Sequence, residues 1–118
     1  MAKILIVDDA RISRRMLRLI LETTEHTIIE ASNGPDAISL YAQEKPDLVF
    51  LDMTMRDMHG LEVLKRLREL DPNAKIIIAT GDIQQHTKDE TATAGAIDFM
   101  IKPFKTQIVH EVLKNALN

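Results

Sequence analysis

The chain has 118 residues, of which 45% are apolar, a length and composition typical of one folded domain rather than of a disordered chain. It contains no cysteine, which excludes a disulfide framework, a thiolate zinc site and a cysteine nucleophile. Its 15 basic and 18 acidic residues give a net charge of −3, which argues against direct binding to a nucleic-acid backbone.

The first apolar run, Lys3–Val7, is continuous and β-branched, which is typical of a strand covered on both faces. Asp8 and Asp9 end this run, which excludes a secretory signal, and no apolar run is long enough to cross a bilayer. We therefore expect a cytoplasmic domain without membrane insertion. A helix follows, predicted by one stripe of residues at helical spacing: Ile12, Met16, Leu19, Ile20 and Thr23.

The next two elements are a strand and a helix. Thr27–Ala31 is the most polar of the five strand-like runs, which places it at an edge of the sheet. The helix after it is entered through Gly34 and Pro35, with proline at the first helical position. Its stripe consists of Ala37, Ile38, Tyr41 and Ala42.

The central part of the chain repeats this alternation. The runs Asp47–Leu51 and Lys75–Ala79 are again continuous and apolar, and they predict two buried strands. The helix between them is predicted by Leu61, Val63, Leu64 and Leu67.

The C-terminal part contains a weak helix, a strand and a strong helix. The window Ile83–Ala94 has few apolar residues and carries threonines that lower helix propensity, so we expect a helix of low local stability that can move. The run Ala96–Ile101 predicts the fifth strand. The last helix is predicted by Ile108, Val109, Val112, Leu113 and Ala116.

Five strands alternating with five helices predict an α/β fold, a doubly wound parallel sheet. Right-handed crossovers leave few topologies, of which the flavodoxin-like order 2-1-3-4-5 is the one expected for five strands. Connections are short and no linker or repeat is visible, so residues 1–118 are predicted to form a single domain.

Ligands of such sheets bind beyond the carboxyl ends of the strands, so the residues that follow each apolar run form the candidate site. Asp8 and Asp9 follow the first run, and Asp52 follows the third. The fourth and fifth runs are followed by Thr80, Gly81 and Asp82, and by Lys102 with Pro103. The predicted order brings strands 1, 3, 4 and 5 together, so that three carboxylates, a hydroxyl and an ammonium meet at one edge.

Carboxylates held this close need a compensating charge. At about 5 Å and an effective dielectric constant near 20, each pair repels by roughly 3 kcal/mol. An all-oxygen site without histidine or cysteine suits a hard cation, and Mg²⁺ is the expected one. Lys102 adds a positive charge for a phosphoryl group, Thr80 adds a hydroxyl donor, and Gly81 leaves the backbone accessible. The pattern indicates phosphoryl transfer to Asp52, which stands alone between the acid pair and Lys102.

Each of these residues also has a simpler interpretation. Asp8 or Asp9 caps the first helix, and Asp52 is an ordinary surface acid. Thr80 only ends a strand, and Lys102 is a surface lysine whose stem covers apolar atoms. The joint pattern favours the site, because every residue falls at the same end of its own strand.

Four segments together resemble the receiver domain of two-component response regulators: KILIVDD, DLVFLDMTMRDMHG around Asp52, IIIATGD ending at Asp82, and DFMIKPF around Lys102. The likeness runs from Lys3 to about Leu117 and is greatest to small, stand-alone, CheY-like chemotaxis regulators. It implies a CheY-like fold with the same strand order.

The resemblance implies which residues hold the metal. Asp52 is the phosphoacceptor and also a ligand of Mg²⁺. Asp9 binds the ion directly, and Asp8 binds it mainly through water. The backbone carbonyl of Thr54 is a further ligand.

The resemblance also implies how the phosphoryl group is bound and sensed. Thr80, Gly81 and Lys102 bind the phosphoryl group. Thr80 moves toward it, and Phe99 stands where the family has its aromatic switch residue. The peptide bond from Lys102 to Pro103 is expected to be cis, a geometry that is rare except before proline.

The chain departs from the family pattern around the phosphoacceptor. Arg56 stands where the family usually has proline, which makes this loop more basic and less rigid. His59 replaces a usual aspartate or asparagine before Gly60. Thr54 and Asp82 occupy the positions that tune dephosphorylation in the family.

The function implied by the resemblance is a signalling switch rather than a dedicated enzyme. The phosphoryl donor is a sensor histidine kinase, a phosphotransfer protein or a small acyl phosphate, and the receiver itself catalyses the transfer. Phosphorylation shifts the face of the fourth helix, fifth strand and fifth helix toward a form that binds a downstream target, in chemotaxis or in another pathway. We expect a monomer or a phosphorylation-dependent dimer.

Two other functions remain open from the residues. A phosphatase of the haloacid-dehalogenase type carries a second acid two residues after its nucleophile, where this chain has Thr54. A pseudo-receiver that binds partners without phosphorylation usually lacks an acid or the lysine, and here Asp8, Asp9, Asp52 and Lys102 are all present.

Overall fold

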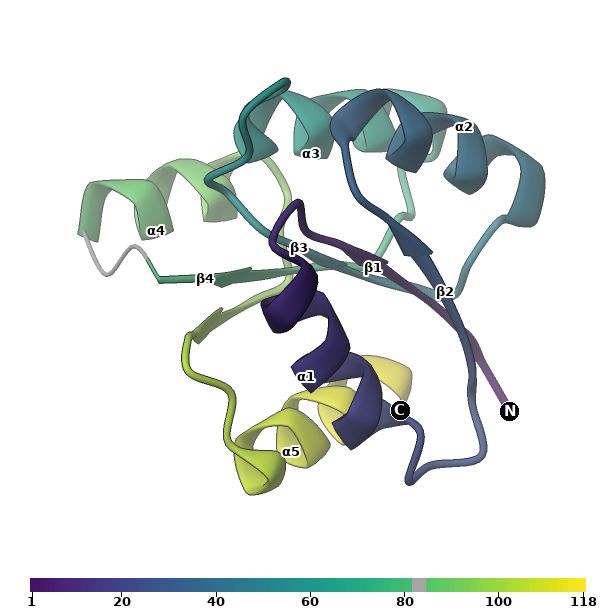
Figure 1. Ribbon diagram of the computed structural model, residues 1–118. Helices are drawn as coiled ribbons and strands as arrows, with labels where there is room; N and C mark the ends of the chain where they lie inside the picture. Colours follow the sequence, from purple (N-terminus) through teal and green to yellow (C-terminus); the bar gives the residue numbers. More distant parts are fainter. Residues whose placement is uncertain (82–84) are drawn as a thin grey trace.

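The computed structural model describes residues 1–81 and 85–118, with the backbone alone for residues 85 and 86. Within them, five strands alternate with five helices (Figure 1). The strands are β1 Lys3–Val7, β2 Thr27–Ala31, β3 Leu48–Leu51, β4 Ile76–Thr80 and β5 Asp98–Ile101. The helices are α1 Arg11–Leu21, α2 Gly34–Glu44, α3 Gly60–Leu70, α4 Gln85–Thr93 and α5 Thr106–Leu117.

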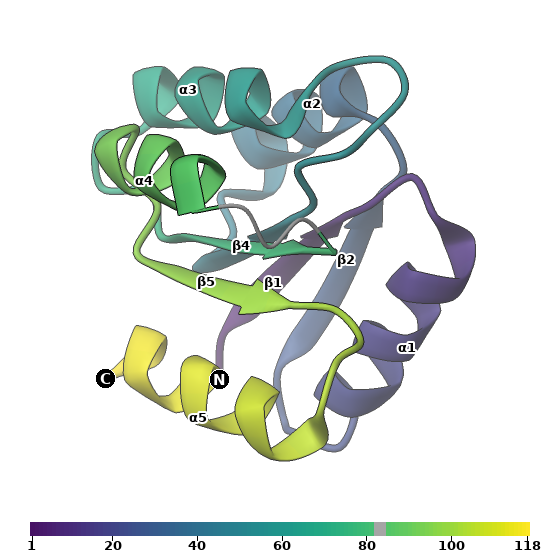
Figure 2. The same cartoon turned by 90° about the vertical axis from the view of Figure 1, so that its left-hand side faces the viewer.

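All neighbouring strands are parallel, in the order β2-β1-β3-β4-β5. The predicted topology is therefore confirmed, including the edge position of Thr27–Ala31. Helices α2, α3 and α4 cover one face of the sheet, and α1 and α5 cover the other (Figures 1 and 2). Among the described residues, no helix combines the length and apolarity that crossing a membrane requires.

The central strands are apolar on both faces because each face meets its own hydrophobic core. In β1, Leu5 and Val7 belong to the core under α2 and α3, whereas Ile4 and Ile6 belong to the core that includes residues of α1 and α5. The same alternation runs through β3, whose four residues are all buried. Full burial of one such side chain contributes about 1.5–3 kcal/mol, so the ends of β1 and β3 are firmly held.

The apolar stripe predicted for the first helix is mostly not its buried face, although Ile20 of that stripe is partly buried against the core. Ile12, Met16 and Leu19 are 76%, 44% and 54% exposed, and the buried residues of α1 are Leu17 and Leu21. These two leucines lie one turn apart and pack against the sheet. In α5, Ile108 is likewise exposed, although Val109, Val112, Leu113 and Ala116 are buried as predicted.

Helix α4 packs through threonines. Among its described side chains, Thr87 and Thr91 are the buried ones, at 7% and 1% exposure. A threonine buries less apolar surface than a leucine and is a weaker helix former. The expectation of little apolar burial in this helix is therefore confirmed. Helices α1, α3 and α5, by contrast, bury leucines or valines.

We predict that α4 is the least protected helix in native-state hydrogen exchange. Its amides are expected to exchange at least about tenfold faster than those of α1, because opening α4 exposes little apolar surface. Exchange monitored by NMR under native conditions measures this. Equal protection of α4 and of the Leu17–Leu21 turn would contradict the prediction.

Gly60 permits a close approach between the start of α3 and the end of β3. A Cβ atom at this position would lie 2.4 Å from the carbonyl oxygen of Asp52 and 2.6 Å from Cα of Met53. The Gly60 N–H donates to the carbonyl of Met53 over 3.0 Å, which closes the loop. The path of the chain after Asp52 thus depends on the absence of a side chain at residue 60.

Gly60→Ala is expected to lower the free energy of unfolding by about 1–3 kcal/mol, because backbone atoms must move to admit the methyl group. Urea unfolding measures the loss. Gly81→Ala is the matched control, since a Cβ there meets no heavy atom of the described residues within 4 Å. A control that loses as much stability as Gly60→Ala would refute the steric explanation.

Candidate functional site

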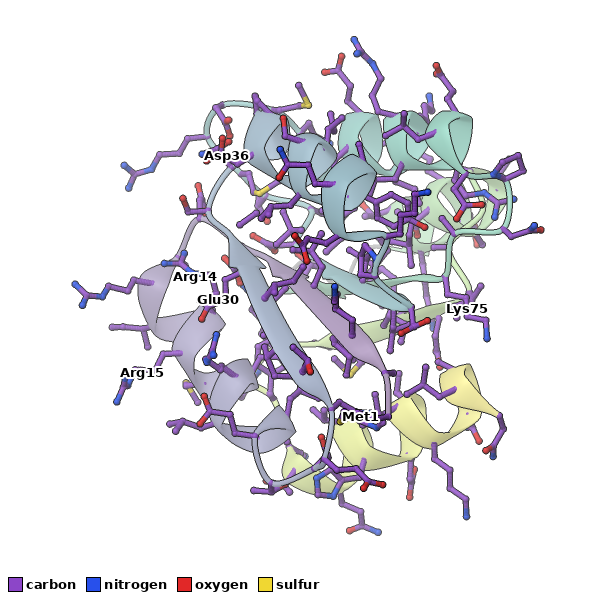
Figure 3. The ribbon with its side chains drawn as sticks, turned by 90° about the vertical axis from the view of Figure 1, so that its right-hand side faces the viewer. Met1, Arg14, Arg15, Glu30, Asp36 and Lys75 are labelled. Atoms are coloured by element: carbon purple, nitrogen blue, oxygen red, sulfur yellow. The ribbon has the colours of Figure 1, made fainter. Side chains whose placement is uncertain are left out.

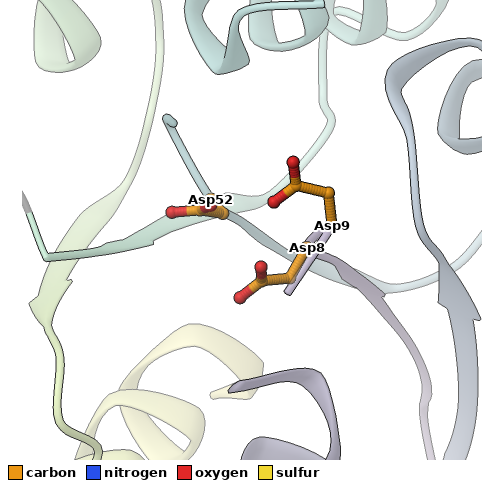
Figure 4. A group of neighbouring side chains, drawn as sticks. All are labelled: Asp8, Asp9 and Asp52. Atoms are coloured by element: carbon orange, nitrogen blue, oxygen red, sulfur yellow. The ribbon is translucent and has the colours of Figure 1, made fainter. Parts of the chain in front are cut away.

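The register of β1 and β3 brings two acids side by side. Val7 pairs with Leu51, and the N–H of Asp52 donates to the Val7 carbonyl over 2.9 Å. Asp8 and Asp52 follow directly, and Asp9 lies beside them (Figure 4). One carboxylate oxygen from each of the three acids lies within 4.8 Å of the others. The structure thus brings together the three acids that the strand ends predicted.

Lys102 supplies a positive charge to this acidic cluster of Asp8, Asp9 and Asp52. It follows β5, and its N–H donates to the Thr80 carbonyl over 2.8 Å. Its Nζ lies 2.8 Å from Oδ2 of Asp8 and 3.6 Å from Oδ1 of Asp52. The ammonium is therefore closest to Asp8, and one cation faces three acids.

Asp52 is buried, with 4% of its surface exposed. Its Oδ1 atom is fully buried and has no hydrogen-bond donor among the described residues. Burial and the charge of Asp8 raise the pKa of Asp52, opposed by Lys102 and by hydrogen bonds from the backbone of Thr54 and the hydroxyl of Thr80. The carboxylate is held by some donors while one oxygen remains available.

Asp8 is fixed by its own loop and by α1. Its Oδ1 accepts a hydrogen bond from the Ala10 N–H over 2.8 Å. Arg14 donates to the Asp8 carbonyl over 2.7 Å and pairs with Glu30 of β2 over 2.8 Å (Figure 3). No side chain caps α1 at Ala10, so the simpler interpretation of these acids as helix caps does not hold.

Asp9 is fixed from the other loop. The N–H of Arg56, in the loop between β3 and α3, donates to Oδ2 of Asp9 over 3.0 Å. His59 ends this loop as the N-cap of α3, and its Nδ1 accepts from the Leu61 N–H over 3.3 Å. Arg56 and His59 thus both have structural partners, although the sequence marked them only as departures.

The residues predicted to sense a phosphoryl group lie at the ends of β4 and β5. Thr80 is fully buried, and its hydroxyl is 3.4 Å from the hydroxyl of Thr54. Gly81 is exposed, which leaves its backbone accessible. Phe99 is partly buried, with Nζ of Lys88 on α4 5.8 Å from its ring centroid. Asp82, predicted to tune dephosphorylation, lies outside the described residues.

The Lys102–Pro103 peptide bond is cis, the geometry that the resemblance implied. Lys102 lies between β5 and α5, and only about a fifth of its side chain is exposed. Its low exposure and its 2.8 Å ion pair with Asp8 do not fit the simpler interpretation of a surface lysine whose stem covers apolar atoms.

Sequence reasoning missed the donors that hold the acids. Arg14 carried a usable signal, because it lies in the first turn of the helix after Asp8, and Glu30 is the acidic residue of the second strand. The Ala10 and Arg56 donors are backbone N–H groups, which leave no mark in the residue type.

Comparisons with known proteins agree with this geometry. A family model for the response regulator receiver domain matches residues 4–114. The chain is 42% identical over 112 residues to the chemotaxis protein CheY of Thermotoga maritima, covering 94% of this chain and 93% of that protein. It is 35% identical over 115 residues to sporulation initiation phosphotransferase F of Bacillus subtilis, covering 98% and 93%.

A solved structure shows the same likeness at the level of the fold. A two-component response regulator from Clostridium difficile superposes with a TM-score of 0.94 at 27% identity, covering 99% of this chain and 96% of that one. The family model spans the acidic cluster, the lysine and all five strands except the first residue of β1. The chain therefore belongs to the response regulator receiver domain family, whose members are phosphorylation-dependent signalling switches.

Proposed function

We propose that Asp52 accepts the phosphoryl group of this receiver. The observation that carries the proposal is the buried Oδ1 atom of Asp52, which has no hydrogen-bond donor among the described residues and lies 3.6 Å from the ammonium of Lys102. An unpaired buried acceptor is costly, so its retention beside a cation fits a nucleophile kept free to react. Asp8 is less suited, because both of its carboxylate oxygens already accept hydrogen bonds.

The acidic cluster fits Mg²⁺. One carboxylate oxygen from each acid lies within 4.8 Å of the others, which gives an all-oxygen donor set, and Oδ1 of Asp52 has no hydrogen-bond donor among the described residues. We assign Asp8, Asp9, Asp52 and the carbonyl of Thr54 as the groups that hold the ion, directly or through water. Bound there, Mg²⁺ would neutralise the charge of the acids and of the phosphoryl oxygens.

In the proposed transfer, the protein mainly positions the reacting groups and stabilises their charge. An oxygen of Asp52 attacks the phosphorus of a phosphohistidine or an acyl phosphate, and the phosphorus–nitrogen or phosphorus–oxygen bond of the donor breaks. Lys102 is placed to exchange its contact with Asp8 for the new phosphoryl oxygens. The donor is a sensor histidine kinase, a phosphotransfer protein or a small acyl phosphate.

In this proposal, phosphorylation changes the surface that adjoins the same edge of the sheet. In the proposed switch, the Thr80 hydroxyl donates to a phosphoryl oxygen instead of to the Asp52 carboxylate, and Phe99 turns into the space that opens. The surface formed by α4, β5 and α5 then binds a downstream target. Exposed apolar residues support this surface, since Ile101 and Ile108 are 49% and 45% exposed.

Two relatives suggest outputs for the switch. One is a chemotaxis protein and the other a sporulation initiation phosphotransferase, and both match nearly the whole chain. We propose a chemotaxis-type output, in which the receiver binds a target protein rather than DNA. The same surface also suits a phosphorylation-dependent dimer.

Incubation with acetyl phosphate and Mg²⁺ is expected to add one phosphoryl group, detected by intact-mass analysis. The adduct should be absent in Asp52→Asn and absent when Mg²⁺ is chelated. Asp57→Asn is the matched control, because Asp57 is an exposed acid of the same loop, and it should accept the group as the parent protein does.

A phosphorylated Asp52→Asn variant would contradict the assignment of the phosphoacceptor. If no adduct forms in the parent protein, beryllofluoride separates rapid hydrolysis from an inactive site. Binding of this phosphoryl mimic would indicate rapid hydrolysis. Its failure to bind would favour a pseudo-receiver, which acts without phosphorylation.

The burial of Asp52 predicts how stability depends on pH without metal. Its raised pKa means that the folded protein holds this proton more tightly than the unfolded chain does. Stability from this group is therefore present at low pH and is lost as the pH rises through the folded pKa. Asp52→Asn, which carries no charge, is expected to be more stable than the parent at pH 7 by roughly 1 kcal/mol.

Urea unfolding in the presence of a chelator, between pH 5 and pH 8, measures this difference. The gain from Asp52→Asn should shrink toward pH 5, and Asp57→Asn should show no such trend. A gain that is constant with pH, or a loss at pH 7, would show that burial of the Asp52 charge and its repulsion by Asp8 do not control the stability of this site.

A further inference from the structure

The two acidic loops are joined by a backbone hydrogen bond. The N–H of Arg56, in the loop after β3, donates to Oδ2 of Asp9, in the loop after β1, over 3.0 Å. Arg56 is exposed and Asp9 is partly buried. Residue 56 therefore touches the acidic cluster through its backbone, while its side chain lies at the surface.

The residue type at position 56 decides whether this bond exists. Proline at this position would have no N–H to donate. The sequence alone suggested that arginine would loosen the loop. The structure shows the opposite local effect, because the residue supplies a donor that ties the loop to Asp9.

The bond leaves Asp9 able to bind a cation. An ionised carboxylate has two oxygens and about four lone-pair sites, and a single N–H uses one of them. Oδ1 is left for a metal, and the N–H fixes the rotation of the carboxylate. Carboxylates that bind metals are commonly held by such outer hydrogen bonds, whose loss typically weakens metal affinity by about 10–100-fold.

The Arg56 N–H also fixes the position of Asp9 relative to the proposed ligands on the loop after β3. Arg56 follows Thr54 by two residues and Asp52 by four, and Asp52 is anchored to β1 through its N–H to the Val7 carbonyl. The position of Asp9 is thus set relative to the chain that carries the other proposed ligands. Asp9 therefore loses less conformational freedom when the ion binds.

We propose that the backbone N–H of Arg56 is a positioning group for the Mg²⁺ site, which raises metal affinity by holding Asp9 in its binding orientation. This inference rests on the proposed metal site. It assigns the effect to the amide and not to the guanidinium, so two substitutions at one position separate them.

The first experiment is a Mg²⁺ titration of the parent protein, Arg56→Ala and Arg56→Pro, followed by backbone amide shifts in NMR. Arg56→Ala keeps the N–H and removes the positive charge, so it is the reference for Arg56→Pro, which removes the N–H as well. We expect Mg²⁺ to bind Arg56→Pro about tenfold more weakly than Arg56→Ala.

Equal affinities of Arg56→Pro and Arg56→Ala, with normal binding by the parent, would overturn this inference and leave the metal site intact. A parent protein that does not bind Mg²⁺ would overturn the proposed metal site and the inference together. The two failures are therefore distinguishable.

A second measurement needs neither metal nor proline. In the metal-free protein, the Arg56 amide proton is expected to shift upfield and to exchange about tenfold faster when Asp9→Ala removes its acceptor. Asp57→Ala, which removes an exposed acid of the same loop, should leave this amide unchanged. An Arg56 amide that does not respond to Asp9→Ala would show that the hydrogen bond is absent in solution.

Discussion

Repulsion among Asp8, Asp9 and Asp52 is the constraint on which the rest of the site depends. Their oxygens lie within 4.8 Å, a separation at which two unit charges repel by roughly 3 kcal/mol at an effective dielectric constant of 20. The single ammonium of Lys102 cannot offset all of this. The N–H groups of Ala10 and Arg56, which donate to the carboxylates of Asp8 and Asp9, offset a further part of it.

The sheet keeps these charges from moving apart. β1 and β3 are apolar on both faces, and each face packs into its own core, so separating their ends would expose large side chains to water. The close approach of Gly60 to Asp52 fixes the loop on the other side. Hydrophobic burial far from the site therefore maintains a repulsion among the acids that a bound cation can relieve.

Residues that could be predicted from sequence are those whose position follows from strand ends. Four of the five predicted strands are nearly continuous apolar runs that stop at a polar residue, so the strand order brought Asp8, Asp52 and Lys102 together. The strand starts were less well defined: β3 and β4 begin one residue later than predicted, and β5 begins at Asp98 rather than Ala96.

The buried face of α1 could not be predicted in this way. Its exposed stripe is as apolar as its buried one, and the choice between them depends on packing. Arg14 and Arg18 flank the buried leucines and both pair with Glu30 of β2, which fixes the rotation of the helix on the sheet. Such partners become visible only when β2 is placed beside α1. Backbone donors such as the Arg56 N–H depend even more on the three-dimensional path of the chain.

The two sides of the site differ in how firmly they are packed, and this difference suits a switch. The acids lie beyond β1 and β3, whose side chains are almost all buried, whereas α4 packs through Thr87 and Thr91 and leaves Phe99 partly buried beneath Lys88. A structural change that follows a change of charge at Asp52 is therefore opposed strongly by the packing of β1 and β3 and only weakly by the packing of α4. A few kcal/mol suffice to shift a two-state equilibrium. We therefore expect the conformational change at α4 and Phe99, where the packing is weaker.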